Sequence, residues 1–141
     1  MRAALATLAL ALLAGCGGGE EGRDFRPAAI AVCDETNDEI RALGAPDSFP
    51  DTQLFARRAK DAVHDQIRGL AELEPSAEDA DAVALYIDSL RQRERLLGQM
   101  AEAADAGSMH DIRETGTQIA KVDDTAREQA TAAGIAECEP R

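Results

Sequence analysis

The chain has 141 residues and a formal charge of −12 at pH 7, with 27 acidic residues against 15 basic ones. Phosphate binding needs clustered Lys and Arg, and the densest basic cluster, Arg91, Arg93 and Arg95, is interrupted by Gln92 and Glu94. We therefore exclude nucleic acid as a partner, and a polybasic membrane patch as well. The chain has no Trp, three Phe and one Tyr, so its core must consist mainly of Ala, Leu, Ile and Val, which favours closely packed helices.

An apolar segment stands at the N-terminus of the sequence. Arg2 precedes an Ala- and Leu-rich run at residues 3–13, and a Gly-rich acidic stretch follows at 17–22. The run has 11 residues, whereas a membrane-spanning helix needs about 20. We therefore interpret residues 1–15 as a cleaved targeting segment rather than a membrane span. The four residues at its end are Leu13, Ala14, Gly15 and Cys16.

These four residues resemble the lipobox of bacterial lipoproteins, which joins an apolar run, small residues and a cysteine in fixed order. The resemblance implies a diacylglyceryl thioether on Cys16, cleavage before that residue, and an extracytoplasmic domain anchored by lipid to a bacterial membrane. Two acyl chains hold a protein more firmly than one. Loss of residues 1–15 removes Arg2 and leaves a formal charge of −13. The alternative is an ordinary secretory signal followed by an unmodified cysteine.

The remaining sequence predicts a flexible tether at residues 16–26 and a helical-bundle domain at 27–141. The tether carries glycines and glutamates with no apolar residue to bury at 17–22. Apolar residues then recur at helical spacing, with no strand-like alternation and no hairpin signal. The first two expected helices cover residues 28–43 and 51–73. The third runs from a cap at Ser76 to about residue 106, and the fourth runs from a cap at Ser108 to Gly134.

Turn and capping residues separate these helices. Pro27 suits a first helical turn, Ser76 and Ser108 are each followed three residues later by Asp, and Gly107 and Gly134 suit helix ends. Short links place successive helices antiparallel, so the predicted fold is all-α, a four-helix up-down-up-down bundle. Two polar residues fall on apolar stripes. We interpret Asn37 as a polar residue in a core seam, and Asp123 as lying at an edge or paired.

The three cysteines have distinct predicted roles. Acylation of Cys16 leaves Cys33 and Cys138 to pair, which explains an odd number of cysteines in an exported chain. An even number of helices returns the chain to the end where it entered, which brings Cys33 and Cys138 together. A compartment outside the cytoplasmic membrane permits oxidation. We therefore expect a disulfide between Cys33 and Cys138, with two buried thiols as the alternative.

Catalytic and cofactor signals are weak in this sequence. The two histidines, His64 and His110, have Asp61 and Glu114 within reach on their own helix faces. Neither histidine follows a Glu by three residues, as the di-iron bundles require, so we interpret both as solvent-facing. No nucleophile elbow and no nucleotide-binding glycine motif is present in the sequence. We expect no enzyme activity and no cofactor.

The C-terminal part of the sequence, a small-residue helix that ends in a cysteine at residues 132–138, resembles that of small helical lipoproteins of high-GC bacteria. This resemblance brings no known activity. We expect a non-catalytic binding or structural module of the cell envelope, with another envelope protein or a cationic ligand as its partner. The alternative is a bundle that binds a metal or small ligand through His64 or His110.

Overall fold

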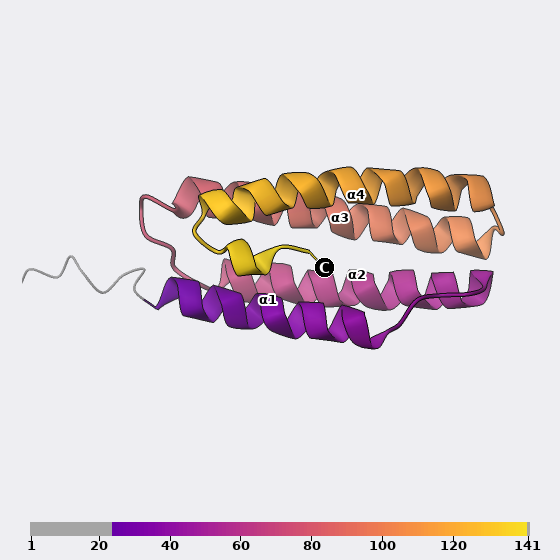
Figure 1. Cartoon of the computed structure of the whole chain (residues 1–141), viewed down its shortest axis with the longest axis horizontal. Coiled ribbons are helices and arrows are strands. Elements are labelled where there is room, and N and C mark those ends of the chain that lie inside the picture. The colour runs from indigo at the N-terminus through magenta and orange to yellow at the C-terminus, as the bar shows by residue number, and fades with distance from the viewer. Residues whose placement is uncertain (1–23, 141) are drawn as a thin grey trace, which may run out of the picture.

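The computed structural model describes residues 24–140, which form an all-α bundle of four helices and a short 3-10 helix (Figure 1). Successive long helices run antiparallel, which confirms the predicted bundle. The proposed lipobox, with Cys16, and most of the predicted tether lie outside the described residues. The elements are α1 (Phe25–Ala42), α2 (Phe49–Ala71), α3 (Ala80–Asp105), α4 (Met109–Ala132) and η1 (Ala136–Cys138).

Serine caps begin two of the helices. Ser48 Oγ accepts a hydrogen bond from the Asp51 N–H at 3.2 Å, and Ser108 Oγ accepts one from the Asp111 N–H at 3.3 Å. Each bond satisfies one of the amide groups that a helix N-terminus leaves without a partner. The serines at these positions therefore serve to start α2 and α4.

Helix α1 begins at Phe25, two residues before the start of the predicted bundle domain. The tether predicted at residues 16–26 therefore extends too far, because Phe25 and Arg26 belong to the helix. Phe25 is only 3% exposed and joins the hydrophobic core. An isolated aromatic residue among charged neighbours gives no periodic signal in the sequence, so its burial became visible only in the folded bundle.

The core is built mainly from aliphatic side chains on all four helices, with the aromatic residues Phe25 and Tyr86 among them. Leu70, Leu90, Val63 and Tyr86 are at most 1% exposed, and the buried residues of α4 are mostly small, ending with Ala126 and Ala130. Small side chains on α4 allow its neighbours to approach closely. The most extensive contacts between elements are those of α3 with α2 and with α4.

Helices α1 and α4 do not meet directly. No Cα atom of α1 lies within 8 Å of one in α4, whereas η1 approaches both helices. At Gly134 a φ of 69° reverses the chain, a backbone angle that favours glycine, and residues 135–139 turn back between α1 and α4 (Figure 1). We call residues 135–139 the C-terminal segment. Ile135 is fully buried and Cys138 is 1% exposed, so the C-terminal segment closes the bundle.

The bundle has two unlike ends. The proximal end holds the start of α1, the α2–α3 connection and the Gly134 turn, and the distal end holds the α1–α2 and α3–α4 connections (Figure 1). Helix α1 has 18 residues whereas α2 has 23, so the α1–α2 connection at 43–48 continues to the distal end without helical structure. No described helix is long and apolar enough to cross a membrane.

Candidate functional site

The disulfide predicted from the cysteine count is confirmed. Cys33, in the middle of α1, is bonded to Cys138 in η1, with their Cα atoms 5.0 Å apart and a sequence separation of 105. Both side chains are at most 1% exposed. The bond therefore ties the C-terminal segment to the first helix from inside the core.

Two buried polar side chains surround this disulfide. Tyr86 of α3 donates its hydroxyl hydrogen to the Cys138 carbonyl at 2.6 Å. Gln66 of α2 donates to Tyr86 Oη at 3.3 Å and to Cys33 Sγ at 3.4 Å. Burial raises the pKa of Tyr86, so the hydroxyl stays a neutral donor. These contacts satisfy polar groups that would otherwise be costly to bury.

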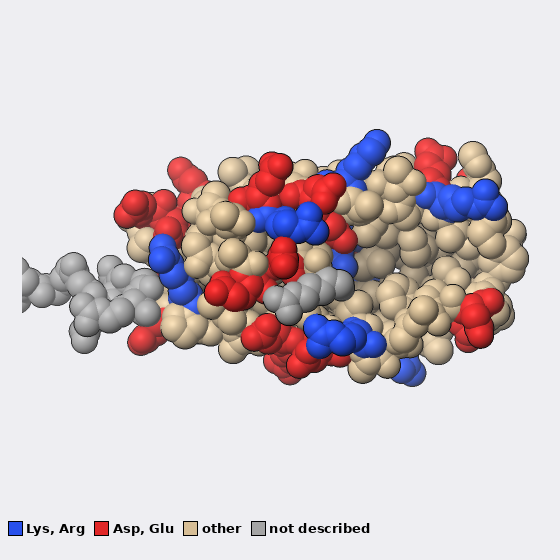
Figure 2. Space-filling view, viewed as in Figure 1, with Lys and Arg blue, Asp and Glu red and all other residues tan. Residues whose placement is uncertain are grey.

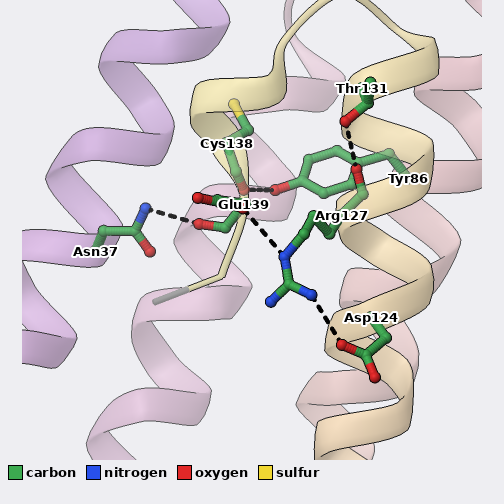
Figure 3. Close-up of polar contacts among 7 residues, drawn as sticks. All are labelled: Asn37, Tyr86, Asp124, Arg127, Thr131, Cys138 and Glu139. Atoms are coloured by element: carbon green, nitrogen blue, oxygen red, sulfur yellow. Dashed lines mark hydrogen bonds and ion pairs between the residues drawn. The ribbon is translucent and has the colours of Figure 1, made fainter.

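The far end of the C-terminal segment is held between α1 and α4 (Figure 3). Asn37 of α1 donates its amide to the Glu139 carbonyl at 3.3 Å. From α4, Arg127 Nε donates to the Glu139 carboxylate at 3.0 Å, and Arg127 also binds Asp124 at 2.8 Å. Asn37 is 5% exposed, so it does lie in a core seam. That seam is formed with the C-terminal segment, and these contacts indicate a structural clamp.

An ion pair joins the apolar stripes of α3 and α4. Arg93 Nε lies 3.0 Å from Asp123 Oδ1, without the geometry of a hydrogen bond, and the two side chains are 9% and 21% exposed. Burial raises the pKa of Asp123, and the Arg93 guanidinium partly opposes that shift. Of the two alternatives from the sequence, Asp123 is therefore paired.

The two histidines lie on different helices, His64 on α2 and His110 on α4. His64 Nδ1 is 3.1 Å from Glu94 Oε1 on α3, and its side chain is 56% exposed. His110, 87% exposed, is 3.8 Å from Glu114 on its own helix. Ligand atoms of His110, Asp111 and Glu114 lie within 4.8 Å of one another, all on exposed residues. Both histidines therefore face solvent, and His64 pairs across helices rather than with Asp61.

The surface charge is unevenly distributed between the two ends. On the face in Figure 2, acidic side chains gather over the proximal half and the C-terminal segment, whereas the distal half shows scattered acidic and basic side chains between uncharged ones. In α1 and in the C-terminal half of α2, acidic residues outnumber basic ones. Residues 52–60, nearer the distal end, include the basic residues Arg57, Arg58 and Lys60. On this face the acidic side chains are therefore concentrated in the proximal half.

Sequence reasoning missed three residues that organise the interior. Arg93 lies on the buried stripe of α3, between Leu90 and Leu97, and that position was a usable signal because a buried charge needs a partner. Gln66 and Glu139 gave no such signal. The partners of Gln66, Cys33 and Tyr86, lie on other helices, so only the packing of α1, α2 and α3 brings them together. Glu139 meets Arg127 because the chain reverses at Gly134.

We also compared the chain with known proteins. No protein-family model, curated protein or solved structure matches it.

Proposed function

We propose that this chain is an exported bacterial lipoprotein whose helical bundle acts as a non-catalytic binding module of the cell envelope. The observation that carries the proposal is the pairing of Cys33 with Cys138. Of the three cysteines, it leaves Cys16 as the one outside the disulfide, directly after the lipobox-like residues. Disulfides persist in oxidising compartments, and a lipobox cysteine carries the lipid anchor. All three cysteines therefore support the same location, outside the cytoplasmic membrane.

The position of the proposed anchor supports a role at the outer surface. Eight residues separate Cys16 from Phe25, the first residue of α1 at the proximal end. Nine peptide steps span at most about 32 Å when fully extended. A lipid on Cys16 therefore keeps the acidic proximal half near the membrane and leaves the distal end accessible to other envelope components.

Replacement of the lipidated cysteine tests this proposal. The Cys16→Ser variant should leave the membrane fraction after detergent-free washing or persist as an uncleaved precursor. Mass analysis of the parent protein should find a diacylglyceryl group on the N-terminal fragment. The variant Cys33→Ala with Cys138→Ala is the matched control, and it should remain attached. A Cys16→Ser variant that stays bound to membranes contradicts the proposal.

A second candidate function is metal binding at the start of α4. The observation that favours it is the grouping of His110, Asp111 and Glu114, whose side chains come from one exposed helical turn. Imidazole and carboxylate are ligands that suit Zn²⁺ and similar ions. Titration with Zn²⁺ by calorimetry should show stoichiometric binding that His110→Ala abolishes and His64→Ala leaves unchanged. Equal weak binding by all three proteins rules this candidate out.

A further inference from the structure

The distal end of the bundle contains a small apolar pocket between the α1–α2 connection and α4. Its volume is about 290 Å³. We call it the distal pocket, and it is lined by Pro46, Asp47, Ser48, Phe49, Thr52, Met109 and Ile112. The pocket exists because α1 ends at Ala42, so an irregular connection replaces helix over the N-terminal turns of α2.

Exposed apolar side chains are concentrated at this same end. Among the described residues, four large hydrophobic side chains are strongly exposed, and three of them lie at or next to the distal end. They are Phe49 at 36%, Leu54 at 51% and Met109 at 47%, whereas Leu85 at 54% lies on α3 in the proximal half. Exposed apolar groups that gather around a pocket mark an interaction surface more often than scattered ones do.

Two carboxylates stand beside the distal pocket. Asp47 lines the pocket and Asp51 lies in the first turn of α2, and a hydrogen bond to Asp51 together with its charge raises the pKa of Asp47. The Ser48 hydroxyl donates to Asp51 and holds the pKa of Asp51 below its usual value. No described Lys, Arg or His lies within ion-pair distance of either carboxylate. Arg58 lines a neighbouring pocket together with Asp47 and Asp51, but it forms no ion pair with either carboxylate. Among the described residues, the negative charge at the pocket rim therefore has no ion-paired counter-ion.

An apolar pocket with an acidic rim is complementary to an apolar side chain that has a Lys or Arg nearby. A second copy of this chain is a poor match because its formal charge is −12 and like charges repel. A purely apolar ligand leaves the two rim carboxylates without a counter-ion. Helices that present apolar residues at three- and four-residue spacing use such pockets to dock.

We propose that the distal pocket docks a cationic amphipathic segment of a partner protein, with an apolar side chain between Phe49 and Met109 and a basic one beside Asp47 and Asp51. This inference deepens the proposed binding role and rests on it. The surface that such a segment would bury at the distal pocket is small, so the contact belongs to the weak, transient class of interfaces. Its negative rim speeds encounter with a basic segment at low salt.

A peptide titration tests the docking site. The probe is a 14-residue helical peptide of Leu and Lys, titrated into the full chain carrying Cys16→Ser, with Met methyl groups labelled for NMR. The Met109 methyl resonance should shift on binding. Phe49→Ser should weaken binding about tenfold, and Asp47→Asn with Asp51→Asn should weaken it about fivefold and reduce its salt dependence.

Matched controls separate docking in the pocket from general attraction to an acidic protein. Leu85→Ser removes an apolar side chain that is more exposed than Phe49 and lies away from the pocket. Asp61→Asn with Asp65→Asn removes an acidic pair on α2 with the same four-residue spacing as Asp47 and Asp51. Both should leave the peptide affinity within about twofold of the parent. Circular dichroism melting of every variant verifies the fold.

Three outcomes overturn the inference. They are no binding of the Leu-Lys peptide, equal weakening by pocket and control variants, and equal affinity for a peptide in which Glu replaces every Lys. None of them depends on lipid attachment, since the titrated chain lacks the Cys16 thiol. A negative result for the docking site therefore does not affect the membrane-fractionation test of Cys16. A negative result in that test likewise does not affect the docking site.

Discussion

The hydroxyl of Tyr86 and the main-chain carbonyl of Cys138 form a 2.6 Å hydrogen bond inside the core, across 52 residues of sequence. Tyr86 is fully buried, and it contributes the principal polar contact between the long helix α3 and the C-terminal segment. The chain's one tyrosine thus fixes the backbone at the disulfide. Closure of the bundle depends on this contact together with the covalent bond.

Tyr86→Phe should lower the free energy of unfolding by about 1–3 kcal/mol, because the Cys138 carbonyl is left buried without its donor. Urea denaturation followed by circular dichroism measures the change. Thr125→Val is the control, since it removes an exposed side-chain hydrogen bond to Lys121 and should change stability by less than about 0.5 kcal/mol. Equal effects of the two substitutions argue against a clamp at Tyr86.

Removal of the disulfide should have the largest effect on stability. Cys33→Ala with Cys138→Ala opens a loop with a sequence separation of 105, for which chain entropy gives up to about 4.7 kcal/mol. That is a large part of the free energy of unfolding of a typical domain, which is about 5–15 kcal/mol. Chemical denaturation measures the loss, and Cys16→Ala should leave stability unchanged. Two thiols that react with an alkylating agent in the exported parent protein contradict the bond.

Arg93→Met should destabilise the bundle by about 1–3 kcal/mol at pH 7, because it leaves the Asp123 carboxylate half-buried without its counter-ion. Burial already raises the pKa of Asp123 above its unfolded value. Without the guanidinium the folded pKa rises further, so the folded state gains stability when Asp123 binds a proton. The loss of stability caused by Arg93→Met should therefore be small at a pH below the pKa of Asp123 in the unfolded chain. It should grow as the pH rises through the pKa of Asp123 in the folded protein.

Unfolding curves for Arg93→Met between pH 4 and about 8 measure this dependence. Arg91→Met is the control, because Arg91 is 53% exposed and pairs with Asp88 on its own helix. Subtracting the control curve removes the titration of the other carboxylates. A difference between the two variants that stays constant with pH contradicts a role for Asp123.

Gly98→Ala should stabilise the bundle by about 0.5–1 kcal/mol, because Gly98 lies inside α3 and Ala has the higher helix propensity. A Cβ atom at this position meets only Lys60 Cδ, at 3.9 Å. Gly69→Ala is the control inside α2, where the new Cβ lies 3.0 Å from Val32 Cγ1. Thermal unfolding should therefore show a higher midpoint for Gly98→Ala and a smaller or negative change for Gly69→Ala.

Local signals in the sequence determined the helices and most of their ends. Ser108, Gly107 and Gly134 act within one helical turn of themselves, so their chemistry can be inferred without knowledge of the fold. Helix α3, however, begins at Ala80 and not at the predicted Ser76 cap. The apolar spacing defined the buried faces for the same reason. The pairing of Cys33 with Cys138 followed from cysteine number and helix number together, which are also properties of the sequence alone.

Tertiary structure alone decided how the bundle closes and where its polar interior lies. The C-terminal segment, and not α4, packs against α1, because the reversal at Gly134 carries Ile135 and Cys138 back into the core. Contacts such as Gln66 with Tyr86, or Arg127 with Glu139, join residues whose separation in sequence has no periodic signature. The distal pocket likewise depends on the early end of α1 relative to its neighbours. These contacts and the distal pocket arise when whole helices pack against one another. The spacing of residues along the sequence does not show how that packing takes place.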